Sequence, residues 1–199
     1  MTTFVFSTEV PNVKPSSSSW ELVTNTRTFQ SPLTGAVQTA ARKGSHWKIS
    51  LTFENLFGEN RANMQAFLAS LEGQEHRFTI EDHSFSRRGT GVDTGLVTAA
   101  SSGNTLNVTR TLSSALTIEK GDYLSANDQL FMATAKVNGT TATSFAITVS
   151  PLVRSSSTGE VVELDTPKGT FILTSSTGWD TKPGIFSSFK IEAIEDVLA

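Results

Sequence analysis

The chain has 199 residues, of which 37% are hydrophobic and 18% are charged, and it contains 25 serines, 28 threonines and no cysteine. Without cysteine it has no disulfide, no thiolate metal site, no iron–sulfur cluster and no cysteine nucleophile. The net charge of 16 − 19 = −3 provides no chain-wide basic field for nucleic acid. We expect one large or two small globular domains, rich in strands because β-branched threonine suits a pleated surface.

The amino terminus and the distribution of apolar residues bear on where the protein works. Residues 1–6 contain neither the basic segment nor the small-residue cleavage site of a signal peptide. No run approaches the roughly 18 to 20 apolar residues that are needed to cross a bilayer. We expect a protein that is made and used without Sec export and without a membrane partner.

The first part of the chain predicts an arm followed by a hairpin. Residues 1–19 contain two prolines and four consecutive serines, which indicate an irregular amino-terminal arm. Threonine- and valine-rich runs at residues 20–30 and 37–42 flank a turn segment, Ser31-Pro32-Leu33-Thr34-Gly35. Because proline and glycine favour turns, the two runs are predicted to pair as a β-hairpin.

A strand and a helix follow with clear periodicity. Apolar and polar residues alternate in the predicted strand, whose apolar members are Trp47, Ile49, Leu51 and Phe53. Apolar residues then repeat at helical spacing, at Met64, Phe67, Leu68 and Leu71. We expect Glu59 or Asn60 to cap the start of this helix and Gly73 to end it. An extended run through His76, Phe78 and Ile80 is expected next.

The second part of the chain consists of short β-runs about ten residues apart. They lie at residues 95–99, 105–109, 123–125, 129–136, 144–150 and 161–164. Turn signals such as Asn127-Asp128 and Asn138-Gly139 separate them, and no helical pattern occurs among them. Short strands at this spacing predict a small barrel or sandwich.

The end of the chain determines the expected domain organisation. Strands predicted at residues 171–173 and 184–194 need partners, because an isolated two-stranded hairpin is marginal in water. Pairing with the first sheet is the simplest solution. We therefore predict a mainly β fold in three parts: an arm at residues 1–19, a discontinuous β-domain with one helix at 20–85 and 168–199, and an inserted small barrel or sandwich at 86–167.

No candidate catalytic or metal-binding pattern is complete. His76 and His83 are seven residues apart on an extended run, so strand alternation predicts that they face opposite sides and share no metal ion. Glu75, Glu81 and Asp82 could supply a carboxylate pair, although acidic residues at strand ends are more often solvated. No Gly-x-Ser-x-Gly motif is present. We expect no catalytic residue, no metal and no cofactor.

Phosphate-binding and nucleic-acid-binding signals are also weak. Gly89-Thr90-Gly91 leads into β-structure rather than into a helix, and Arg87-Arg88 is interpreted as a solvated junction. The inserted region has six basic and seven acidic residues. Its aromatic residues Phe131 and Phe145 lie in apolar runs and are expected in the core, so a stacking surface for single strands is disfavoured. Sugar binding by this region has no support in the sequence.

Several segments together resemble the tail structural proteins of phages with long non-contractile tails. The resemblance covers about residues 20–199 and rests on residues 20–35, 42–47 and 56–78, on Gly178-Trp179, and on residues 183–189. Glu119-Lys120-Gly121-Asp122-Tyr123 and Gln129-Leu130-Phe131 are similar to the inserted barrel of distal tail proteins from this virus class.

This resemblance implies a non-enzymatic virion protein of the tail, assembled in the bacterial cytoplasm. Such a protein would form a hexameric ring where the tail tube meets the tip, would bind the tube protein, the hub and side fibres, and would let DNA pass through its lumen. Its main domain, at residues 20–85 and 168–199, would be a β-sandwich with one helix and a projecting hairpin. Its inserted domain, at 86–167, would be a small β-barrel with an oligonucleotide/oligosaccharide-binding-like fold. A ring interface is heterologous, so a projecting hairpin could augment a neighbour's sheet.

Three functions therefore remain open. The preferred one is a distal tail ring subunit, and the rivals are a tail tube subunit and a carbohydrate-binding or carbohydrate-degrading protein of the tail tip. For the preferred function we predict that the projecting hairpin supplies subunit-interface residues, although Phe29 and Val37 could equally pack in the domain's own sheet. The predicted interface residues are Arg27, Phe29, Pro32, Leu33 and Val37.

Overall fold

The computed structural model describes residues 1–91, 95–111, 114–155, 158–175, 178–181 and 186–197. The helices in these ranges are α1 (Phe6–Glu9) and α2 (Gly58–Ser70). The strands of the amino-terminal part are β1 (Thr3–Val5), β2 (Ser17–Val23), β3 (Thr26–Gln30), β4 (Val37–Ala41), β5 (His46–Leu56) and β6 (Arg77–Glu81). The later strands are β7 (Leu96–Thr98), β8 (Thr105–Arg110), β9 (Leu116–Ile118), β10 (Tyr123–Ala126), β11 (Gln129–Ala133), β12 (Val137–Thr140), β13 (Ser144–Ser150), β14 (Lys168–Leu173), β15 (Trp179–Thr181) and β16 (Ser187–Glu195).

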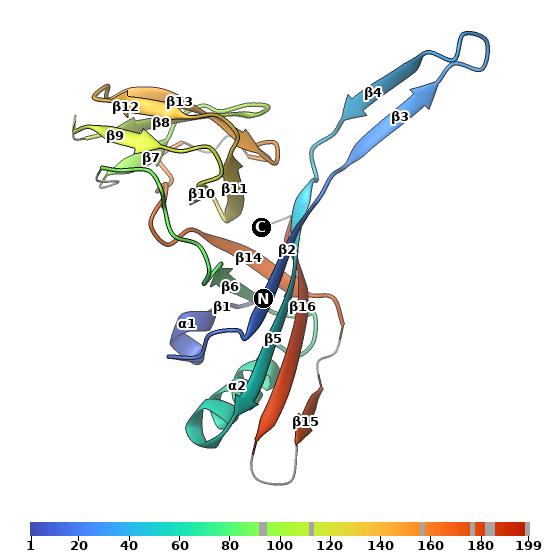
Figure 1. The fold of residues 1–199 in the computed structure, drawn as a ribbon, viewed down its shortest axis with the longest axis vertical. Helices are drawn as coiled ribbons and strands as arrows, with labels where there is room; N and C mark the ends of the chain where they lie inside the picture. Colours follow the sequence, from blue (N-terminus) through green and yellow to red (C-terminus); the bar gives the residue numbers. More distant parts are fainter. Residues whose placement is uncertain (92–94, 112–113, 156–157, 176–177, 182–185, 198–199) are drawn as a thin grey trace.

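Seven strands form the main sheet, in the order β1-β6-β14-β16-β5-β2, and β15 also pairs with β16. The long strand β5 runs antiparallel to both β2 and β16. These three strands follow the long axis of the molecule, whereas β6 and β14 cross it, so the sheet is strongly curled (Figure 1). The strands near the carboxyl terminus therefore join the amino-terminal strands in one sheet, as predicted.

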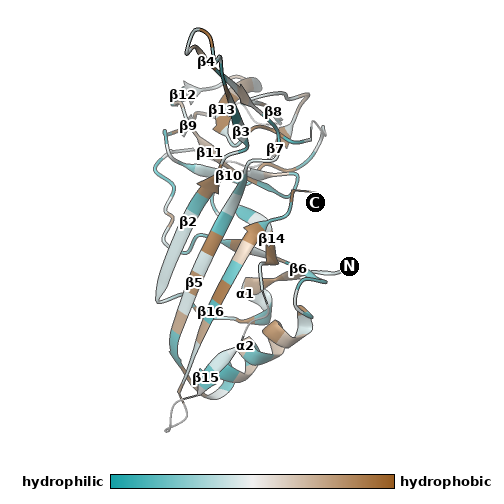
Figure 2. Ribbon diagram, turned by 90° about the vertical axis from the view of Figure 1, so that its right-hand side faces the viewer, coloured by the Kyte–Doolittle hydropathy of each residue, from teal (hydrophilic) through white to brown (hydrophobic). Residues whose placement is uncertain are grey.

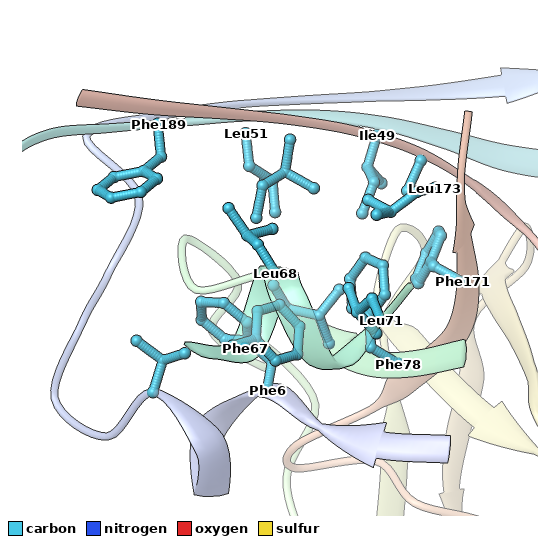
Figure 3. Packing of buried hydrophobic residues seen from close by; sticks show 14 of the residues in the cluster. Phe6, Ile49, Leu51, Phe67, Leu68, Leu71, Phe78, Phe171, Leu173 and Phe189 are labelled. Carbon is cyan, nitrogen blue, oxygen red and sulfur yellow. The ribbon is translucent and has the colours of Figure 1, made fainter. Parts of the chain in front are cut away.

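The main apolar core lies between this sheet and α2, as Figure 3 shows. The predicted alternation in β5 is confirmed, because the four predicted apolar side chains are buried: Trp47, Ile49, Leu51 and Phe53. Apolar and polar bands alternate along β5 and β16 in Figure 2. Aromatic rings fill the space toward β6 and β14, with the Phe67 and Phe78 centroids 5.7 Å apart and the rings edge to face.

The amino-terminal segment is part of this core, so the prediction of an irregular arm at residues 1–19 is wrong. β1 pairs in parallel with β6, and β2 already begins at Ser17, inside the serine run. Between these strands three apolar side chains enter the core, namely Phe6, Val10 and Val13. The sequence did not predict this arrangement, because three scattered apolar residues among prolines and serines give no periodic signal.

The helix α2 occurs where helical spacing predicted it, with a different start. It begins at Gly58, and its amino-terminal cap is Phe57, whose side chain makes no capping hydrogen bond. The expected caps Glu59 and Asn60 instead lie inside the first turn, where an acidic residue still suits the helix dipole. Gly73 follows the helix with φ +71°, the left-handed conformation expected of a terminating glycine.

The inserted region forms a small barrel around a second apolar core. Five of its strands make a sheet in the order β10-β11-β13-β8-β7, and β9 pairs with β12. The predicted run at residues 161–164 is not a full strand, but it closes the barrel through bridges from Val161 to Val97 and from Glu163 to Ser125. Asn138-Gly139 lies inside β12 rather than in a turn, which corrects the prediction there.

The aromatic residues of the barrel are largely internal. Phe131 is buried in the barrel core, as predicted, and Phe145 is half-buried against it. Tyr123 instead packs against the main core, beside Trp20 and Trp47. The predicted mainly β fold, with a helix-covered sheet, a projecting hairpin and a small barrel, is confirmed. The domain boundaries after residues 85 and 167 stay predictions.

Candidate interaction surfaces

The hairpin of β3 and β4 projects from the body beyond the end of the main sheet (Figure 1). The predicted interface residues lie on it, and the apolar ones are exposed: Phe29 by 55%, Leu33 by 94% and Val37 by 60%. The alternative that Phe29 and Val37 pack in the domain's own sheet is therefore wrong. β3 is exposed along its whole length, so neither of its faces is covered by the chain itself.

The strand register places the predicted residues on different sides of the hairpin. Phe29 is opposite Gln38 and Arg27 is opposite Ala40, which puts these residues on one face. Val37 is opposite Gln30 and lies on the other face. Pro32 and Leu33 lie in the turn, which is closed by hydrogen bonds from Ser31 N to Ala36 O and from Gly35 N to Ser31 O, each 2.9 Å. The five residues therefore surround the hairpin tip rather than form a single face.

Hydrogen bonds at its base fix the direction in which the hairpin projects. The Asn25 side chain donates to the Lys43 carbonyl at 2.9 Å, and the Asn25 backbone N–H donates to Ser45 Oγ at 3.0 Å. Lys43 Nζ donates to the carbonyl of Arg154 in the inserted barrel at 3.2 Å. The two connectors at the hairpin base are thus bonded to each other, and the base is also bonded to the barrel region.

The hairpin is also the basic part of an acidic chain. Residues 24–45 contain Arg27, Arg42 and Lys43 and no acidic residue, a net charge of +3. The rest of the chain then has 13 basic and 19 acidic residues, a net charge of −6. A surface of this charge attracts acidic partners through long-range electrostatics.

A second exposed apolar group lies where β5 ends and β16 begins, and we call it the aromatic end. It consists of Phe57, Trp179 and Phe186, which are 60%, 44% and 43% exposed. The Phe57 and Phe186 rings meet edge to face with centroids 5.7 Å apart. Beside Trp179, a cavity of about 430 Å³ is lined by residues that include Asp180, Ser188 and Lys190. Sequence reasoning did not single out this group, because exposure of an aromatic residue has no local signature.

The barrel and the main sheet are joined by a buried polar network. Trp47 Nε1 donates to the Leu130 carbonyl at 3.0 Å. The Glu195 carboxylate, at the end of β16, accepts hydrogen bonds from Leu130 N at 2.7 Å and from Trp47 N at 3.2 Å. Arg154 completes the network with a 2.5 Å contact from Nη2 to Glu195 Oε2 and further donations to the Ser45 and Asp196 carbonyls.

The charge state of this network follows from burial. The Glu195 side chain is fully buried, and removal from water raises its pKa, against the opposing effects of Arg154 and the two backbone N–H groups. Arg154 is thus the compensating charge for a buried carboxylate. Its side chain donates to the Ser45 carbonyl just before β5 and to Glu195 and Asp196 at the end of β16. Arg154 therefore ties its own barrel segment to two segments of the main domain and is a positioning residue for the junction.

The candidate catalytic carboxylates and histidines lie in two separate places. Glu81, Asp82 and His83 line a cavity of about 280 Å³ together with Lys14 and Asp165. There Asp82 accepts hydrogen bonds from Ser84, and His83 Nδ1 lies 3.8 Å from Glu81 Oε1. These groups bind each other, and no serine or second base is aligned with His83 among the described residues.

His76 and Glu75 lie on the turn after α2, away from that cavity. In the described part of the chain, one set of potential metal ligands has its atoms within 4.8 Å of one another: Glu72, Glu75 and His76. Both glutamates are exposed. His76 Nδ1 also accepts a 3.4 Å hydrogen bond from Thr2 N. His83 is not in this set, in keeping with the prediction that the two histidines diverge.

Gly89-Thr90-Gly91 is a packing element. A Cβ on Gly89 would lie 2.1 Å from the Thr117 carbonyl, and one on Gly91 would lie 2.2 Å from the Ala115 carbonyl. The backbone N–H groups of Arg88 and Gly89 donate to the buried Asp122 carboxylate, an anion that the chain itself supplies. Arg87 is largely buried and bonded to Asp165 Oδ1 at 2.9 Å, so its interpretation as a solvated residue is wrong, whereas Arg88 is exposed.

No family model matches this chain, and no curated protein matches it either. No helix among the described residues is both long and apolar enough to cross a membrane. The segment 183–185, on which part of the resemblance to phage tail proteins rests, lies outside the described residues.

Proposed function

We propose that this chain is a structural subunit of a phage tail, a distal tail protein whose copies form a ring that joins the tail tube to the tip and lets DNA pass. The observation that carries the proposal is the projecting hairpin. Its strands expose both faces, its tip carries Phe29, Leu33 and Val37, and two-stranded hairpins are marginally stable alone in water. A neighbouring subunit would supply the missing contacts.

Two further features support a structural role. The buried polar groups Glu195 and Arg154 hold separate parts of the chain together, because their hydrogen bonds and ion pair link the barrel to the main domain. The body around the basic hairpin has a net charge of −6, which suits a conduit that must not retain DNA. In the proposed ring the acidic body, rather than the hairpin, would face the lumen.

Purified protein and isolated tails provide the test of this function. We expect native mass spectrometry and negative-stain images to give a closed ring for the wild type, and antibody labelling to mark one end of the tail in the virus that encodes the chain. The double variant Phe29→Asp, Leu33→Asp should lose the ring. Val161→Asp, at an exposed apolar residue of the barrel, should keep it. If the double variant still forms the same ring, the hairpin is not the subunit interface. If the antibody labels the whole length of the tail, the chain is a tail tube subunit instead.

A further inference from the structure

We infer that the hairpin of one copy binds the aromatic end of the next copy, so that subunits associate head to tail. This inference rests on the proposed function as a self-associating subunit and specifies the surface that receives the hairpin. The two partners are the hairpin tip with Phe29, Leu33 and Val37, and the aromatic end with Phe57, Trp179 and Phe186.

The first argument is the placement of exposed apolar side chains. These six residues are among the large apolar side chains that remain exposed in the described part of the chain, and they form two groups. β5 begins beside the hairpin base and ends at the aromatic end, 11 residues later. At about 3.3 Å per residue, the strand separates the hairpin base from the aromatic end by about 35 Å, and the hairpin tip lies farther still. Figure 1 shows the hairpin and the β15 end of the sheet at opposite ends of the molecule.

The second argument is charge complementarity. The hairpin carries Arg27, Arg42 and Lys43 without any acidic residue. Exposed carboxylates flank the aromatic end, namely Glu54, Glu59 and Asp180. Among the described residues, the exposed Lys190 beside Trp179 already has a partner, because its Nζ lies 2.6 Å from Glu192 Oε1. The hairpin is therefore apolar and basic, whereas the aromatic end of the same chain is apolar and acidic, so the two surfaces are complementary.

The third argument excludes the symmetric arrangements. Two hairpins packed together would bring two segments of net charge +3 into one interface, and two aromatic ends would bring together six carboxylates. Like charges at an interface are strongly unfavourable. Contact between unlike ends is heterologous. Such a contact repeats from copy to copy, and it closes into a ring or continues as a stack according to its rotation.

Because the chain has no cysteine, single introduced cysteines can identify the contact. Thr34→Cys places a thiol beside Leu33 in the exposed turn, and Ala62→Cys places one on an exposed position of α2, one turn after Phe57. Both substitutions spare the residues of the proposed contact. We expect a mixture of the two variants, with different tags, to form a bismaleimide-linked heterodimer at least about tenfold faster than Thr34→Cys mixed with Ala142→Cys. Ala142 is an exposed alanine of the barrel and serves as the matched control.

Charge reversal separates the proposed contact from a general loss of structure. Arg27→Glu with Arg42→Glu in the Thr34→Cys chain should slow cross-linking at least about tenfold, as should Glu54→Lys with Glu59→Lys in the Ala62→Cys chain. Mixing the two reversed chains should restore the rate, which unfolding of either chain could not do.

The outcomes distinguish this inference from the proposed function. If Thr34→Cys and Ala62→Cys cross-link no faster than the control pair at up to millimolar protein, and closed rings still form, the head-to-tail contact is overturned. The proposed structural role is unaffected by that result. Faster linkage of Thr34→Cys to itself than to Ala62→Cys overturns it in favour of a symmetric hairpin contact. Absence of the chain from tails contradicts the proposed function itself.

Discussion

At the scale of single residues, the chain uses carboxylates and glycines to bring backbone segments together. Asp122 is buried and accepts backbone hydrogen bonds from Arg88, Gly89 and Glu119. Gly89 lies so close to the Thr117 carbonyl that no side chain fits between them. The glycine and the carboxylate act together. The close approach of Gly89 to the Thr117 carbonyl, which leaves no room for a side chain, is also what allows the Gly89 N–H group to reach Asp122.

Gly89→Ala should therefore destabilise the fold by about 1–3 kcal/mol, since the new methyl group overlaps a backbone carbonyl that cannot move freely. Gly178→Ala is the matched control, because Gly178 has no atom within 4 Å of an added Cβ. Its effect should stay within about 0.5 kcal/mol. Urea unfolding followed by circular dichroism measures both variants, and equal midpoints for the two would contradict the packing role of Gly89.

At the scale of elements, β1 and α1 show how a weak sequence signal can still give a core element. Phe6 is fully buried and its ring meets Phe53 and Phe67 at centroid distances of 5.6 and 5.3 Å. The backbone of β1 gains its hydrogen bonds from β6, which is more than 70 residues away in sequence. The segment is therefore stabilised by tertiary contacts, with almost no help from local preference.

Phe6→Ala should cost about 3–5 kcal/mol of unfolding free energy, which is usual for a large side chain removed from a packed core. Val5→Ala, next to it in sequence and partly exposed, should cost less than about 1 kcal/mol. Denaturant unfolding and hydrogen exchange of β6 can be measured on the same samples. A small loss for Phe6→Ala, with unchanged protection of β6, would mean that the amino-terminal segment is a dispensable arm after all.

At the scale of the whole molecule, two apolar cores are held in one arrangement by the junction of Glu195, Arg154 and Trp47. The Leu130 carbonyl and N–H both point into this junction, and Leu130 also packs in the main core although it belongs to a barrel strand. A fixed barrel orientation matters for any assembly in which every copy must present the same surfaces.

Arg154→Met should destabilise the protein by about 3–5 kcal/mol at pH 7, because it leaves the Glu195 carboxylate buried without its cation. Burial raises the pKa of Glu195, and loss of Arg154 raises it further, so the folded variant takes up a proton more readily than the unfolded chain as the pH falls. The deficit relative to wild type should therefore shrink between pH 7 and pH 5.

Urea unfolding at both pH values measures this difference. Lys120→Met, at an exposed lysine of the barrel, should lose less than about 1 kcal/mol at either pH and serves as the control. If Arg154→Met lowers the free energy of unfolding by the same amount at pH 7 and at pH 5, the lost stability does not come from a buried Glu195 charge without its cation.

Features that depend on local periodicity and turn chemistry could be predicted from the amino-acid sequence. The alternation in β5, the apolar stripe of α2, the Pro-Gly turn of the hairpin and the short strands of the barrel all follow from side-chain spacing. The exposure of Phe29 and Val37 stayed open at this level, because both residues could equally have packed in the domain's own sheet.

Features that depend on contacts between distant residues are visible only in the folded chain. Four such features bring together segments that are far apart in the chain. They are the burial of Phe6, the closure of the barrel by residues 161–164, the contact of Glu195 with Arg154, and the placement of Phe57 beside Phe186. The scattered aromatic and charged residues involved have no periodic pattern, and their partners are fixed by how the sheet curls. The two ends that we propose to meet became visible for the same reason, since exposure is a property of the folded surface.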